Sequence, residues 1–152
     1  MRKMILASSI TATAILAFGT LTLARPEVTK AQGGSHSMKI ALTGGAKKPG
    51  PGDPDGSGTV DLTLNHDKGE VCYEITTKDI QTVTAAHVHL GAIDKAGPPK
   101  VTLKKAADGT WKSCVGADKA LLNDIQKNPA NYYVNVHNAE FPNGALRGQL
   151  GK

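Results

Sequence analysis

Aromatic side chains are scarce in this sequence, and their scarcity limits what the protein can bind. Only 4% of the 152 residues are aromatic. Beyond residue 32 the chain carries 14 basic and 12 acidic side chains, and its only basic doublets, Lys47-Lys48 and Lys104-Lys105, have no aromatic neighbour. Nucleic-acid-binding surfaces combine clustered Lys and Arg with aromatic side chains on which bases stack. No nucleic-acid partner is therefore expected, although the formal net charge of the whole chain is +5.

Common catalytic signatures are also missing. The sequence has neither the Gly-x-Ser-x-Gly segment of serine hydrolases nor a glycine-rich phosphate-binding loop. A chain of this length is too short for a two-domain dinucleotide-binding enzyme. Its 17 glycines and 8 prolines are instead typical of a protein built from many short elements joined by turns.

The first 24 residues have the pattern of a secretory signal peptide. Two basic residues precede an apolar run over 4–18, and small residues follow up to Ala24. We predict cleavage after Ala24 or alternatively near 31. An uncleaved anchor helix is the other interpretation, but the Ser and Thr content of the run makes it a poor membrane span. The mature protein is then exported, periplasmic or secreted, without a membrane span, and residues 25–37 form a flexible lead-in.

Cysteine is limited to one pair, Cys72 and Cys114. An exported chain meets an oxidising environment, in which such a pair forms a disulfide. The alternative role as metal ligands lacks the close Cys-x-x-Cys spacing that zinc sites usually show. We therefore predict a disulfide between them.

Short runs of alternating apolar and polar residues, separated by Gly, Pro, Asn and Asp, predict strands along the body of the chain. One helix is expected over 117–127, with Asp118 as its N-cap. This pattern indicates an all-β protein, an antiparallel Greek-key sandwich or barrel of about seven or eight short strands. The expected strands are 38–43, 59–65, 70–77, 81–90, 101–104, 111–115, 132–136 and 145–150.

A pair of histidines on one predicted strand is the first candidate site. Successive side chains of a strand point to opposite faces, so His87 and His89 share a face if Val88 and Leu90 enter the core. Two neutral imidazoles at this spacing can bind one copper or zinc ion. The alternative is a pair of surface or hydrogen-bonded histidines that only shape a loop.

A third histidine follows the same alternation on a later strand. His137 and Asn135 lie on one face of that strand, and Val134 and Val136 lie on the other. If the two strands are neighbours, His137 completes a three-nitrogen site with an open position. Asn135 and Asn138 would then fix imidazole tautomers, or else they stabilise the turn that follows the strand.

Five segments of the chain resemble the CHRD domain, the module named after chordin, in both order and spacing. The resemblance assigns residues 38–152 to one such domain and implies an exported, single-domain protein of a kind without an established activity. The segments are Ala86-His-Val-His-Leu-Gly91, Gly97-Pro98, Tyr133-Val-Asn-Val-His137, Phe141-Pro142-x-Gly144 and Leu146-Arg-Gly-Gln-Leu150.

The CHRD domain in turn is distantly similar to the copper/zinc superoxide dismutases. That similarity implies copper ligation by His87, His89 and His137 and an anion-guiding role for Arg147. The zinc-binding loop of those enzymes has no counterpart after His89. Arg147 has a second interpretation, that of a structural arginine paired with Asp or Glu.

Three functional hypotheses follow. The first is an exported binding module that holds a transition metal, copper before zinc, at the histidine cluster. The second is a metal-free interaction or structural module of the cell envelope, with an envelope or extracellular partner. The third is a dismutase-like oxidoreductase, which ranks last because fold analogy does not transmit activity.

Overall fold

The computed structural model describes residues 33–151. The predicted signal peptide and both predicted cleavage positions lie outside the described residues. Within them the chain forms eight strands, one α-helix and one short 3-10 helix. In chain order these are β1 (Ser35–Thr43), β2 (Ser57–Asn65), β3 (Glu70–Lys78), β4 (Val83–Leu90), β5 (Pro99–Leu103), β6 (Lys112–Gly116), α1 (Lys119–Lys127), η1 (Pro129–Asn131), β7 (Tyr132–Asn138) and β8 (Leu146–Gln149).

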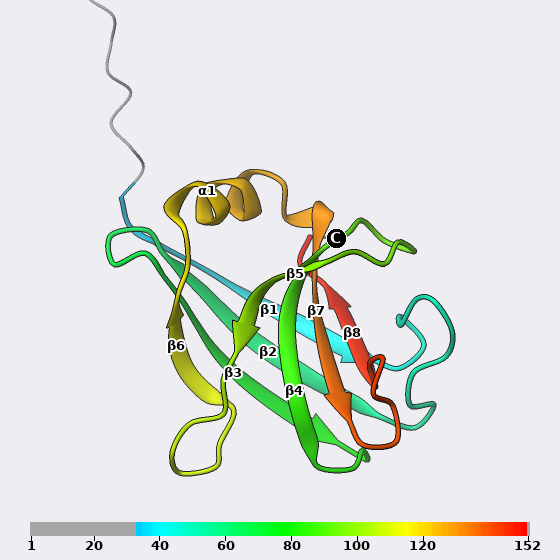
Figure 1. The fold of residues 1–152 in the computed structure, drawn as a ribbon. Coiled ribbons are helices and arrows are strands. Elements are labelled where there is room, and N and C mark those ends of the chain that lie inside the picture. The colour runs from blue at the N-terminus through cyan, green and yellow to red at the C-terminus, as the bar shows by residue number, and fades with distance from the viewer. Residues whose placement is uncertain (1–32, 152) are drawn as a thin grey trace, which may run out of the picture.

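All eight strands belong to one antiparallel sheet, whose order is β5-β4-β7-β8-β1-β2-β3-β6. The sheet curls until its two end strands, β5 and β6, approach each other, so that it forms a nearly closed barrel (Figure 1). This arrangement confirms the predicted all-β class, with eight antiparallel strands and one short helix.

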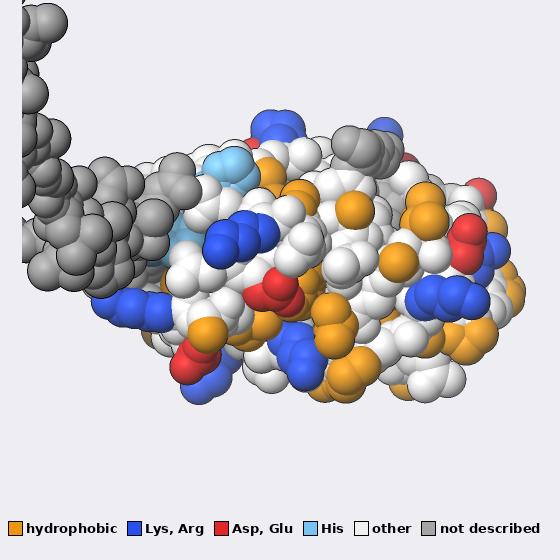
Figure 2. Space-filling view, turned by 90° about the horizontal axis from the view of Figure 1, so that it is seen from above, with side chains coloured by type: hydrophobic (Ala, Val, Ile, Leu, Met, Phe, Trp, Pro, Cys, Tyr) orange, Lys and Arg blue, Asp and Glu red, His pale blue; other side chains and the backbone are white. Residues whose placement is uncertain are grey.

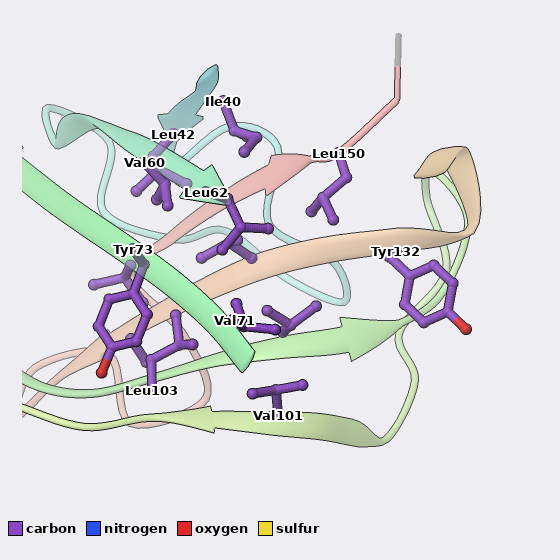
Figure 3. Close-up of a cluster of buried hydrophobic side chains, with 14 of the residues drawn as sticks. Ile40, Leu42, Val60, Leu62, Val71, Tyr73, Val101, Leu103, Tyr132 and Leu150 are labelled. Atoms are coloured by element: carbon purple, nitrogen blue, oxygen red, sulfur yellow. The ribbon is translucent and has the colours of Figure 1, made fainter. Parts of the chain in front are cut away.

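The core fills the inside of the barrel and follows directly from the alternation of side chains along the strands. On β2, Val60, Leu62 and Leu64 are fully buried, as are Val134 and Val136 on β7. Figure 3 shows such side chains from several strands packed against one another. Burying each of these aliphatic groups stabilises the fold by about 1.5–3 kcal/mol. The outward-facing residues of the same strands are therefore free to serve other roles.

Strand β1 begins earlier than predicted. Ser35 pairs with Asn65 of β2, and Ser37 Oγ lies 2.8 Å from Thr63 Oγ1. The predicted lead-in over 25–37 is therefore wrong for its last three residues, which are part of the sheet. Their side chains are exposed and polar, so no hydrophobic alternation marks them.

Helix α1 covers one end of the barrel (Figure 1). Its predicted cap is confirmed, because Asp118 Oδ1 accepts hydrogen bonds from the backbone amides of Ala120 and Leu121. Leu122 and Ile125 are the fully buried residues of its inner face. Basic and acidic side chains are interspersed over this end of the molecule (Figure 2).

The predicted disulfide is present. Cys72 of β3 and Cys114 of β6 are direct cross-strand neighbours, at the centre of the five residue pairs that join these strands. Strand β6 is an end strand of the sheet and pairs only with β3. The covalent bond therefore ties an end strand to the barrel.

A pH-dependent contact joins α1 to β7. The buried hydroxyl of Tyr132 donates a hydrogen bond to Asp124. Burial, followed by this bond and the nearby charge, raises the pKa of Tyr132 to about 12. A raised pKa adds stability that is complete below the ordinary tyrosine pKa of 10 and is lost as the pH rises through the folded-state value.

We therefore expect the alkaline loss of stability to be shallower in Tyr132→Phe than in the wild type. Urea denaturation at a series of pH values between 10 and about 12 measures this difference. The other tyrosines are common to both proteins, so they cancel in the comparison. Parallel curves for the two proteins would contradict the role assigned to Tyr132.

Candidate metal centre

Pairing between β4 and β7 brings the three predicted histidines together. In the register of these strands His87 faces Asn135, His89 faces Tyr133, and His137 faces Ala85. The intervening residues Ala86, Val88, Val134 and Val136 are fully buried in the core. The imidazoles therefore project from the opposite, outer face of the sheet, as the alternation predicts.

The three rings are close enough to share one ion. His87 Nδ1 lies 3.2 Å from His137 Nε2. One nitrogen from each ring can be chosen so that all three lie within 4.8 Å of one another. Ligands bonded at about 2 Å to one tetrahedral ion are about 3.3 Å apart, so binding would shorten these separations by about 1.5 Å at most.

Backbone carbonyls fix the tautomers of two of the rings. His89 Nδ1 donates to the carbonyl oxygen of Gly97 at 2.8 Å, and His137 Nδ1 donates to that of Pro142 at 2.9 Å. A carbonyl oxygen only accepts hydrogen bonds, so both Nδ1 atoms carry the proton and both Nε2 atoms carry a lone pair. This bond from the second ring nitrogen is the usual support of a metal-binding histidine.

One lone pair of the cluster has no partner. His89 Nε2 is buried and receives no hydrogen bond. Leaving such a group unsatisfied costs about 1–3 kcal/mol. A metal ion held with His87 and His137 would satisfy it.

The surroundings of two of the three rings favour their neutral form. Burial lowers the pKa of His87, with further contributions from the charged forms of His137 and His89. Burial also lowers the pKa of His89, which the bond to Gly97 opposes and the charges of His137, Arg147 and Lys47 reinforce. Metal ligation requires neutral imidazole, so the folded chain holds these two rings in the form that a metal needs.

The two asparagines predicted beside the cluster have different positions. Asn135 Nδ2 donates to His137 Nε2 at 3.2 Å and also contacts the carbonyl oxygen of Asn143. Asn138 contacts no imidazole. Its Oδ1 accepts a hydrogen bond from the amide of Phe141 at 2.7 Å, which stabilises the turn after β7. The turn role, the second of the two interpretations, is therefore the one that Asn138 has.

Arg147 does not have the surroundings that either interpretation predicts. Its side chain is 2% exposed, and its guanidinium lies 3.5 Å over the ring of Tyr133. It donates to the carbonyl oxygens of Lys95 and Ala92 and to Gln149 Oε1. It is thus structural, but carbonyls replace the predicted carboxylate partner, and it presents no donor to an anion in solvent.

Arg147 supports the cluster from behind. Through Lys95 and Ala92 it holds the loop 91–98, which contains the Gly97 carbonyl that orients His89. Tyr133, against which the guanidinium packs, stacks on the ring of His89 with 4.9 Å between centroids. The loop and the ring are therefore held in place together.

Some residues of the site could not be predicted from the sequence. Nothing in a Gly- and Pro-rich loop distinguishes Lys47, which is 6% exposed and lies beside the cluster. The orienting carbonyls of Gly97 and Pro142 leave no trace in residue type, although both residues belong to the segments that resemble a known domain. A second group of candidate ligand atoms, at Glu70, Cys72 and Cys114, is excluded because both sulfurs are in the disulfide.

Comparison with known proteins identifies one relationship. The family model described as the CHRD domain matches residues 38–150. No curated protein and no solved structure matches the chain. Among residues 33–151, no helix is long and apolar enough to cross a membrane.

Proposed function

This chain belongs to the CHRD-domain family, and we propose that it is a binding module that holds one transition-metal ion on His87, His89 and His137. The observation that carries the proposal is the buried, partnerless Nε2 of His89, which lies beside two further imidazoles. Tautomers already fixed by Gly97 and Pro142 support it, since they leave Nε2 of both His89 and His137 unprotonated. A metal would replace the hydrogen bond that His137 Nε2 accepts from Asn135.

Copper is the metal that this donor set favours over zinc. Imidazole nitrogen suits both metals, but copper binds a given nitrogen site more tightly. The cluster contains no carboxylate or thiolate ligand to neutralise charge, and Lys47 and Arg147 are close enough to lower the pKa of His89. Positive surroundings disfavour a divalent ion more than a monovalent one. Of the two metals only copper has a monovalent state available to it.

Binding, rather than catalysis, is the proposed activity. The dismutase analogy assigns the task of guiding an anion to the metal to Arg147, and this residue is buried and bonded to carbonyls. The disulfide fits a protein that works in an oxidising compartment. We therefore propose that the metal is bound after export, in the periplasm or outside the cell.

Metal loading tests the proposal directly. The purified protein is stripped with a chelator, incubated with Cu(I), Cu(II) or Zn(II), passed through a desalting column and assayed for metal. We expect about one copper ion per chain, and we expect copper to displace zinc in competition. If the protein retains neither metal, the metal-free interaction module would remain as the function.

A further inference from the structure

Lys47 is a buried cation without an anionic partner. Its side chain is 6% exposed, and its ammonium donates one hydrogen bond, to the carbonyl oxygen of Lys48 at 3.1 Å. The ion pairs formed within residues 33–151 join other side chains: Lys39 with Asp61, Lys78 with Asp79, and Lys112 with Glu74. Burying a charge is costly unless it is paired, so the position of Lys47 calls for a partner from outside the chain.

Backbone hydrogen bonds and a glycine in a neighbouring turn fix the position of the Lys47 side chain. The amide of Lys47 donates to the carbonyl oxygen of Gly44, and the end of the same loop is fixed by a bond from the amide of Asp53 to the carbonyl oxygen of Ala145. Gly144 has a φ of +124°, and a Cβ there would overlap both Lys47 Cε and the side-chain amide of Asn135. A glycine at this turn therefore leaves the space that the lysine stem occupies.

The stem runs along a pocket next to the histidine cluster. The pocket has a volume of about 430 Å³, and no Asp or Glu is among its lining residues. Its apolar walls come from Pro49, Tyr133 and Pro142, and His89 and His137 form its border with the cluster. Burial lowers the pKa of Lys47, and the charge of Arg147 lowers it further. A bound anion would therefore stabilise the charged form of Lys47.

We propose that this pocket binds a small organic carboxylate, with its oxygens on the Lys47 ammonium and its apolar body against the exposed rings of Pro49 and Pro142. A carboxylate accepts charge-assisted hydrogen bonds from the ammonium protons that Lys48 leaves free. Small-molecule sites typically combine such apolar walls with one or two placed polar groups. This site is separate from the proposed metal-binding function, because Lys47 and the pocket walls belong to the chain and require no bound metal.

A monocarboxylate fits these features better than an inorganic oxyanion. One ammonium supplies a single compensating charge, which a monoanion balances and a phosphate dianion exceeds. Phosphate also offers no apolar surface to Pro49 and Pro142. Benzoate is therefore the probe, and inorganic phosphate is the comparison.

The test uses metal-free protein, so that its outcome is independent of metal binding. Benzoate and, separately, phosphate are titrated while backbone amide shifts are followed by nuclear magnetic resonance. We expect saturable benzoate binding with a dissociation constant of about 1 mM, with shifts concentrated at Lys47, Gly97 and Asn143. Phosphate should bind at least about tenfold more weakly.

Variants identify the cation responsible. Lys47→Met, which keeps the stem and removes the charge, should weaken benzoate binding at least about tenfold. Lys105→Met removes the same charge from an exposed position outside the pocket and should leave the affinity within about twofold. If Lys47→Met does not fold, as judged by circular dichroism, Lys47→Gln takes its place with the same expectation.

Three results would overturn the proposal. They are the absence of saturation with benzoate, an unchanged affinity when Lys47 is neutralised, and a phosphate affinity equal to or greater than that of benzoate. The first two would remove the anion site, and the third would replace the carboxylate by an inorganic anion. None of them depends on whether the histidines hold copper.

Discussion

Replacing both His87 and His89 by alanine is expected to lower copper affinity by at least about a hundredfold. The double substitution removes two of the three nitrogens that lie within 4.8 Å of one another. His137 alone, on the neighbouring strand, cannot hold the ion against competing water and chelators. Competition with a chromogenic copper chelator measures the affinity of the wild type and of the variant.

The matched control is His36→Ala. His36 is an exposed histidine of β1 and does not belong to the cluster, so its loss should leave copper affinity unchanged. The double variant should also remain folded, because its missing rings come from the outer face of the sheet and the core beneath is intact. A folded double variant that binds copper as tightly as the wild type would place the metal elsewhere and refute the assigned ligands.

Removing the disulfide is expected to produce the largest loss of stability. The Cys72→Ser/Cys114→Ser variant frees a segment with a sequence separation of 42. In the chain-entropy model, closing a loop of this length lowers the free energy of the folded state relative to the unfolded state by about 4 kcal/mol. Urea denaturation of the oxidised wild type and of the variant measures the difference, which would be a large part of the stability of a domain of this size.

Copper affinity provides a second readout for the same variant. The disulfide joins β3 to β6, whereas the imidazoles come from β4 and β7. We therefore expect the folded variant to bind copper like the wild type.

A loss of stability below about 1 kcal/mol would contradict the first expectation. It would show that the unfolded chain gains little conformational freedom when the disulfide is absent.

Much of the candidate site is predictable from local pattern. Alternation places His87 and His89 on one face and Val88 on the other, and it does the same for His137 and Val136. A period of two is a property of any extended strand, so it requires no knowledge of the fold. The helix cap at Asp118 and the cross-link of the only two cysteines are local or compositional inferences of the same kind.

Contacts between distant segments are what the sequence alone does not reveal. Strands β4 and β7 are separated by β5, β6 and α1 in the chain, and only the barrel makes them neighbours. The partners of Arg147 are backbone carbonyls, which every residue possesses, so no residue type indicates them. Lys47 is buried because its loop folds back onto the turn that contains Gly144. The conformation of a loop produces no periodic sequence pattern, so this burial could not be predicted.

The pairing of β4 with β7 has one further consequence, which concerns the fidelity of folding. A one-residue slip of a strand exchanges its two faces, so it would turn His137 inward and Val136 outward. The same register therefore determines both the aliphatic packing of the core and the meeting of the imidazoles. Copper bound at this site would therefore stabilise only chains in which β4 and β7 pair in the native register, because a chain with misaligned strands has no three-nitrogen site.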